Sequence, residues 1–233
     1  IYVPSISFAK SRSRYFMPWF GDQITVGKST YFNAGYGDIL KGNETQITNW
    51  AATQWSKYFT QIQSINTLFE NLGEVSNGEQ KNRIIGEAHF MRGYYYYMLW
   101  RMFGGVTLID HTYNPLIKEE KFPRASYQQM VDFIVAEADE AAKYLPQVHA
   151  TSETGRATLG AALMLKAKTY MWASSKVFQN KDADKTYLGF ADDQSRQMLE
   201  KAKQTYEQLF ALKQYSLIPI SATTQDGIRE EYR

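Results

Sequence analysis

Cysteine is absent from the 233-residue sequence, and the sequence also has no long apolar run. Without cysteine the chain has no disulfide framework, no thiolate ligand for a metal and no cysteine nucleophile. The longest apolar run, residues 94–100, is mostly tyrosine and falls far short of the roughly 20 residues that a helix needs to cross a bilayer. The sequence therefore excludes a disulfide scaffold and a membrane-spanning helix.

A clustered excess of one charge is also missing. Lysine and arginine number 26, aspartate and glutamate number 24, and the formal net charge is +2 at pH 7. Nucleic-acid binding depends on a clustered basic surface that neutralises phosphates. The composition therefore gives no reason to expect a nucleic-acid partner. With 44% hydrophobic residues, the chain is long enough for one sizeable globular domain or two small ones.

The motifs that support catalysis or metal binding are incomplete. His89, His111 and His149 lie far apart and form no metal-binding pair on one helix. Asp182 and Asp184 begin like a calcium loop, but the glutamate that closes such a loop is missing. Adjacent acidic pairs lie in polar surroundings, whereas a general acid needs burial to raise its pKa. We therefore predict a protein that is not an enzyme and that holds no metal or cofactor.

Helical periodicity is the main structural signal. Apolar residues recur every three or four positions in five segments, at about 53–72, 81–103, 126–145, 157–178 and 194–212. Their start-to-start spacing of roughly 30 to 45 residues is near that of tetratricopeptide repeats. We predict a mainly α fold, a tetratricopeptide-like stack of helical hairpins with long irregular loop insertions. We treat the chain as one domain, in which a helical scaffold at 51–217 lies between a loop-rich region at 1–50 and a polar tail at 218–233.

Individual residues predict where these helices begin and which faces they bury. Ser126 followed by Gln129 matches a capping box for the third helix. On the second helix, Arg83 and Glu87 lie four residues apart and are placed to pair. The fourth helix is small or apolar almost all round, which predicts cover on more than one side. The fifth has a one-sided stripe that we expect to face the core, formed by Leu199, Ala202, Tyr206, Leu209 and Phe210.

Aromatic residues make up 15% of the sequence, and many lie in the region before the helices. Flat rings stack on the apolar C–H faces of sugars, while amide and carboxylate groups hydrogen-bond their hydroxyl groups. The first 50 residues combine both kinds of group. We predict that ligand-binding residues lie there, namely Trp19, Tyr31, Asn33, Tyr36, Asp38 and Trp50. The alternative that stays open is that these rings only pack the region onto the helices.

The second helical segment carries a motif that resembles a known family. Residues 87–96 read Glu-Ala-His-Phe-Met-Arg-Gly-Tyr-Tyr-Tyr, and Phe-Gly-Gly-Val follows at 103–106. This order is similar to the SusD/RagB family of outer-membrane nutrient-binding lipoproteins. Further matches at 55–66, 124–126 and 155–175 follow in the family's order, so the resemblance spans about 22–217. Thr107 departs from the pattern, because proline is common there in the family.

The resemblance implies a fold, a location and a role. Family members are considerably longer, so it implies a C-terminal half that is absent from this chain. It implies a lipid anchor upstream of Ile1 and a position on the extracellular face of the outer membrane. There the protein would capture oligosaccharide or polysaccharide, or peptide as in some relatives, and deliver it to a SusC-like TonB-dependent transporter.

The motif residues that the resemblance singles out are structural. Glu87 and Arg92 are expected to tie helices together, Asn66 to satisfy the backbone of a turn, and Gly104 and Gly105 to form one. Two other functions stay open. One is a tetratricopeptide-like scaffold that binds a protein partner, and the other, least favoured, is a helical glycoside hydrolase.

Overall fold

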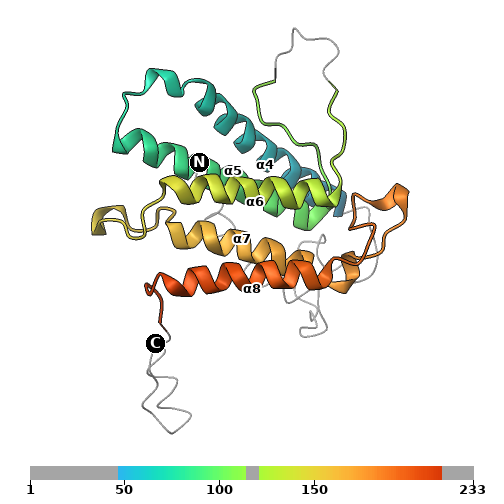
Figure 1. Ribbon diagram of the computed structural model, residues 1–233. Helices are drawn as coiled ribbons and strands as arrows, with labels where there is room; N and C mark the ends of the chain where they lie inside the picture. Colours follow the sequence, from blue (N-terminus) through green and yellow to red (C-terminus); the bar gives the residue numbers. More distant parts are fainter. Residues whose placement is uncertain (1–46, 114–120, 217–233) are drawn as a thin grey trace, which may run out of the picture.

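Five α-helices make up most of the described chain. The computed structural model describes the backbone of residues 47–113 and 121–216. Its helices are α4 (Ile47–Glu70), α5 (Glu79–Phe103), α6 (Tyr127–Tyr144), α7 (Leu159–Ala173) and α8 (Ser195–Ala211) (Figure 1). Short 3-10 turns lie between them at Leu72–Glu74, Thr151–Glu153, Lys176–Phe178 and Ala183–Lys185. None of the helices within the two described ranges is both long and apolar enough to cross a membrane.

Each helix packs mainly against its neighbours in the chain. The pairs α4 with α5, α5 with α6, α6 with α7, and α7 with α8 form the main contacts. Figure 1 shows α5 to α8 stacked with alternating direction, while α4 crosses the stack at an angle. Contacts between consecutive helices are the defining feature of helical-hairpin repeats. The predicted mainly α fold is therefore confirmed.

Helix α5 forms the centre of the core because α4, α6 and α7 all contact it. Tyr95, Tyr96, Leu99 and Trp100 on this helix are at most 1% exposed. The Trp100 ring lies 4.9 Å from that of Tyr127, the first residue of α6. Large rings bury more apolar surface than aliphatic side chains of the same core. A good part of the aromatic content therefore stabilises the scaffold.

Local sequence signals explain the ends of α6 and α7. The Ser126 hydroxyl accepts from the backbone N–H of Gln129, and the Gln129 side-chain oxygen accepts from the backbone N–H of Ser126. The predicted capping box is therefore confirmed. Helix α7 ends at Ala173 rather than near residue 178, and the chain continues through a 3-10 turn at Lys176–Phe178. Both α6 and α8 cover α7, as its apolar surface predicts.

The buried face of α8 agrees with the predicted one only in part, since Ala202 and Leu209 are buried as predicted and Leu199 and Phe210 are not. Met198, Ala202 and Leu209 are at most 4% exposed, whereas Leu199 and Phe210 are 57% and 68% exposed. Residues one position apart on a helix point about 100° apart, so two overlapping apolar stripes compete on this helix. The stripe that packs against α7 is the one with the smaller side chains, and the outer stripe stays at the surface.

Candidate functional site

The predicted ligand-binding residues lie outside the described side chains. Trp19, Tyr31, Asn33, Tyr36 and Asp38 all precede residue 47, where the description begins. Trp50 belongs to α4 by its backbone, but its side chain is outside the described part as well. Their role in binding stays a prediction. The residues named as structural are all described, and they cluster around α5.

A buried arginine joins three helices. Arg92 on α5 donates from Nε to Glu137 Oε2 at 2.9 Å and from Nη2 to Oε1 at 2.7 Å, so the pair with α6 is bidentate. Its Nη1 also donates to Asn66 Oδ1 on α4 at 3.0 Å. The guanidinium carbon lies 4.5 Å from the centre of the Phe69 ring. His89 Nδ1 also lies 3.1 Å from Glu137 Oε2, so the carboxylate has a second neighbour besides Arg92. Because all three groups are buried, removing one would leave the others with fewer hydrogen-bond partners.

The same network fixes the loop that follows α5. Asn66 Nδ2 donates to the backbone oxygens of Ile109 at 3.0 Å and His111 at 2.9 Å. The Tyr96 hydroxyl accepts from the Ile109 amide at 2.7 Å. The amide of Asn66 therefore uses its oxygen for Arg92 and its nitrogen for the loop. This arrangement satisfies backbone groups that would otherwise be buried without partners.

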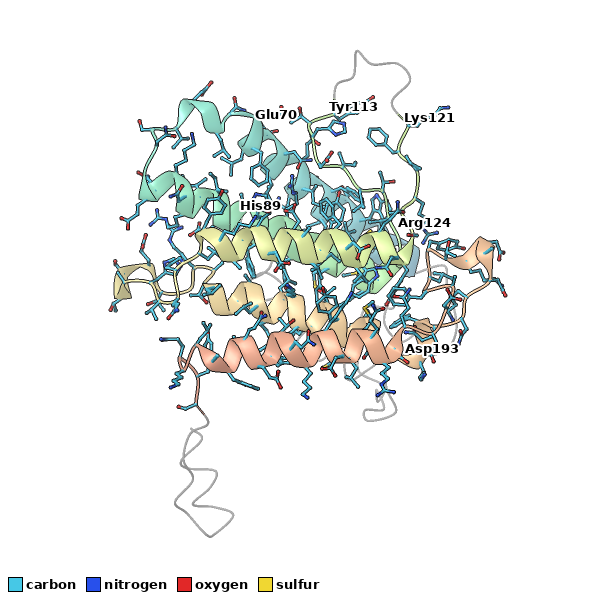
Figure 2. The ribbon with its side chains drawn as sticks, in the orientation of Figure 1. Glu70, His89, Tyr113, Lys121, Arg124 and Asp193 are labelled. Carbon is cyan, nitrogen blue, oxygen red and sulfur yellow. The ribbon has the colours of Figure 1, made fainter. Side chains whose placement is uncertain are left out.

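The secured loop presents two exposed rings near the end of α4. Glu70 accepts from the Thr112 amide at 2.9 Å and from its hydroxyl at 2.6 Å, and these hydrogen bonds lower the pKa of Glu70. Tyr113 follows directly and is 51% exposed, and its ring centre lies 5.8 Å from that of Phe122. Figure 2 shows Glu70, Tyr113 and Lys121 along the same edge of the molecule. We call Tyr113 and Phe122 the ring pair.

Close backbone contacts hold the base of this loop. Gly104 ends α5 with a φ of 70°, and a Cβ added to Gly105 would lie 1.9 Å from the Ala125 backbone oxygen. Arg124 donates from Nη2 to the Phe103 backbone oxygen at 2.6 Å, which places a cation at the C-terminal end of α5. Only glycine fits at both positions of this turn. The two ends of the connection between α5 and α6 are therefore joined.

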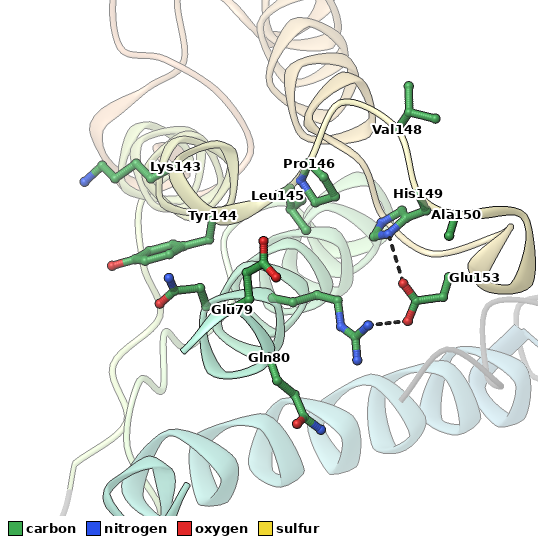
Figure 3. Close-up of a pocket in the computed structure, with 12 residues that line it drawn as sticks. Glu79, Gln80, Lys143, Tyr144, Leu145, Pro146, Val148, His149, Ala150 and Glu153 are labelled. Carbon is green, nitrogen blue, oxygen red and sulfur yellow. Dashed lines mark hydrogen bonds and ion pairs between the residues drawn. The ribbon is translucent and has the colours of Figure 1, made fainter. Parts of the chain in front are cut away.

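A polar pocket lies at the opposite end of α5. It has a volume of about 600 Å³ and lies between the first turns of α5, the end of α6 and residues 145–153 (Figure 3). Arg83 forms an ion pair there with Glu153, which also lies 3.9 Å from His149. Glu87 pairs with Arg156 at 3.0 Å. The expected pair between Arg83 and Glu87 is therefore wrong, because partners from the facing segment replace a contact that contributes only a few tenths of a kcal/mol.

The acidic residues that resembled a calcium loop lie in a short turn. Asp182 precedes the 3-10 turn Ala183–Lys185, and its carboxylate pairs with Lys185 at 3.0 Å. Across residues 47–113 and 121–216, no three His, Asp or Glu side chains gather as a metal site would require.

Sequence reasoning missed the ring pair. Tyr113 and Phe122 lie outside the helical stripes, in the long connection between α5 and α6. This is the same property by which the N-terminal rings were selected, so the signal was present in the sequence. What the sequence does not give is the contact between the two rings or the hydrogen bonds that fix the loop beneath Tyr113.

Comparison with known proteins identifies the family. A model of SusD-like proteins, described as starch-binding and associating with the outer membrane, matches residues 11–171. A SusD-like protein of Formosa agariphila is 25% identical over 135 residues, which cover 58% of this chain and 26% of the relative.

Solved structures share the fold. A SusD-like carbohydrate-binding protein from Bacteroides fragilis has a TM-score of 0.61 at 21% identity, covering 80% of this chain and 32% of that protein. A structure determined with xylogluco-oligosaccharide has a TM-score of 0.57 at 22% identity, covering 72% of this chain and 30% of that protein. The chain thus spans about a quarter of the curated relative and about a third of each solved structure. The resemblance seen in the sequence is confirmed, and the chain belongs to the SusD-like family.

Proposed function

We propose that the whole protein is a non-catalytic binding lipoprotein on the extracellular face of the outer membrane. In this role it captures oligosaccharides or polysaccharides and passes them to a SusC-like TonB-dependent transporter. The observation that carries the proposal is the match of residues 11–171 to a family described as starch-binding and associating with the outer membrane. The solved neighbours that are named for carbohydrate binding or were determined with an oligosaccharide support the same ligand class.

The ring pair suits a sugar ligand chemically. Tyr113 and Phe122 are 51% and 38% exposed, so both rings can contact the C–H face of a sugar. The Glu70 carboxylate, which borders the loop through Thr112, is an acceptor for sugar hydroxyl groups. Hydrogen bonds from α4 and α5 already hold residues 109–112, so binding at Tyr113 loses little further conformational entropy. The ring pair is therefore our described candidate for a glycan contact, alongside the predicted N-terminal residues.

The electrostatics of the described carboxylates support binding rather than hydrolysis. Glycoside hydrolysis needs a general acid whose pKa is raised by its surroundings. Hydrogen bonds lower the pKa of each described carboxyl group that is clearly shifted, namely Glu70, Asp110, Glu140 and Asp193. The lowered pKa values of these four groups favour the ionised form, which accepts hydrogen bonds and does not donate a proton.

Affinity electrophoresis of the whole protein tests the proposal. We expect a gel containing a soluble polysaccharide from a broad panel to retard the protein. Substitutions Trp19→Ala, Trp50→Ala and Tyr113→Ala should each weaken that retardation. Phe210→Ala is the matched control, because it removes an exposed ring from the outer face of α8. Absence of retardation across the panel would contradict glycan capture, and an equal loss in the control would contradict the assignment of the rings.

A further inference from the structure

A second hollow, of about 440 Å³, lies where the last turns of α5 meet the end of α7. Five of its lining residues are apolar or aromatic, namely Tyr97, Met171, Trp172, Val177 and Phe178. Met171 is 52% exposed and Val177 is 70% exposed. Exposed apolar side chains around a hollow mark a surface that can bury an apolar group of a partner. We call this site the α5–α7 hollow.

Two cations line the same hollow. The guanidinium carbon of Arg101 lies 4.5 Å from the centre of the Trp172 ring and 5.4 Å from that of Tyr97. Arg101 Nε is buried and has no hydrogen-bond partner within the described chain. Lys168 also lines the hollow, and no described residue of the lining carries a carboxylate that could pair with it. The positive charges of Arg101 and Lys168 would therefore stabilise an anionic group of a ligand in the hollow.

The charge of this hollow contrasts with that of the pocket near Arg83. In that pocket, Arg83 and Glu153 neutralise each other. Among the described residues that line the α5–α7 hollow, none carries a carboxylate to oppose Arg101 and Lys168. The hollow is therefore apolar inside and positively charged, which is complementary to a ligand that is apolar and anionic.

We propose that the α5–α7 hollow binds an acidic peptide segment of a partner protein. An apolar side chain of the segment packs against Met171, Trp172 and Val177, and a neighbouring carboxylate pairs with Arg101 and Lys168. A sugar is the weaker fit, because its hydroxyl groups need several hydrogen-bonding partners. Apart from the two cations, the described side chains of the lining offer the hydroxyls of Tyr97 and Ser175 and the indole N–H of Trp172.

Fluorescence anisotropy with the whole protein tests this assignment. The probe is a fluorescein-labelled peptide of sequence Gly-Glu-Leu-Glu-Glu-Leu-Gly, and its counterpart has lysine at every glutamate position. We expect the acidic peptide to bind and the lysine peptide not to bind. Lys168→Glu should lower the affinity for the acidic peptide by about tenfold or more, since it reverses a charge at the contact. Arg101→Met should lower this affinity as well. Circular dichroism checks that both variants stay folded.

Lys203→Glu is the matched control. It makes the same change of charge at an exposed position on α8, outside the hollow. We expect its affinity for the acidic peptide to equal that of the unmodified protein. The proposal is overturned if the acidic peptide does not bind, if both peptides bind equally, or if Lys203→Glu weakens binding as much as Lys168→Glu. It is also overturned if oligogalacturonate binds in a Lys168-dependent manner and the acidic peptide does not.

Discussion

Arg92 and Arg101 lie on the same helix and both stack on aromatic rings, yet their surroundings differ. Arg92 contacts Phe69 and donates hydrogen bonds to Glu137 and Asn66. Arg101 contacts Trp172 and has a buried Nε without a partner in the described chain. Helix α6 offers a carboxylate opposite Arg92, whereas α7 offers a tryptophan ring opposite Arg101. Arg92 is therefore part of a buried hydrogen-bond network, whereas Arg101 lines a hollow in which no described carboxylate opposes its charge.

Replacement of Arg92 should have the largest effect on stability. Arg92→Met removes the bidentate donor to the buried Glu137 carboxylate, which then keeps only the contact with His89, and it removes the donor to the Asn66 oxygen. Breaking a buried pair from one side typically costs about 3 to 5 kcal/mol, so we expect the free energy of unfolding to fall by that order. Urea denaturation of the whole protein measures it. A loss below about 1 kcal/mol would show that water replaces the arginine and that the network does not hold the helices.

Replacement of Asn66 should have the next largest effect, and a more local one. Asn66→Ala removes the donor to the backbone oxygens of Ile109 and His111. A buried acceptor left without its partner costs about 1 to 3 kcal/mol. We expect faster amide hydrogen exchange in residues 109–113, with less change in α7 and α8. Uniformly faster exchange throughout the described helices would contradict a specific role in fixing the loop.

Replacement of Arg101 should lower the free energy of unfolding less than replacement of Arg92 does. Arg101→Met removes a cation–π contact with Trp172 but leaves no described carboxylate without a partner. Such contacts are worth about 0.5 to 1 kcal/mol at partly exposed sites. The urea midpoint should therefore move much less than in Arg92→Met. Equal losses in the two variants would remove the distinction between the two arginines.

Acidification should release the loop at Glu70 with little change elsewhere. The hydrogen bonds from Thr112 hold the pKa of Glu70 below its ordinary value. The attachment is therefore present above the unfolded pKa and is lost as the pH falls through the lower pKa of the folded state. We expect the protection of the Thr112 amide against hydrogen exchange, relative to its intrinsic rate at each pH, to fall below the ordinary carboxyl range, about pH 4. Glu70→Gln should remove this pH dependence, and a dependence that persists in that variant would assign it to another group.

The fold was predictable where the signal is local. Ser126 and Gln129 define the start of α6 through contacts three residues apart, and the structure has that start. The face of α8 was not predictable in the same way, because Leu199 and Met198 belong to stripes of similar apolar content. Only the contact with α7 decides between them.

The candidate site shows the same limit. Asn66 and Arg92 could be named from the motif, but their shared contact with the loop at 109–111 depends on residues far apart in the sequence. Arg83 pairs with Glu153 across the pocket rather than with Glu87 along the helix, and Glu153 is likewise far from Arg83 in the sequence. The contact between Tyr113 and Phe122 could not be predicted either, because the two residues lie on either side of residues 114–120.

Calorimetric titration of the whole protein with oligosaccharides, followed by mass analysis of the recovered sugar, shows whether the protein binds a glycan without cleaving it. We expect saturable binding to at least one glycan, recovery of that glycan intact, and weaker binding in Tyr113→Ala than in Phe210→Ala. A glycan recovered in shortened form, or no heat of binding with any glycan, would contradict this expectation.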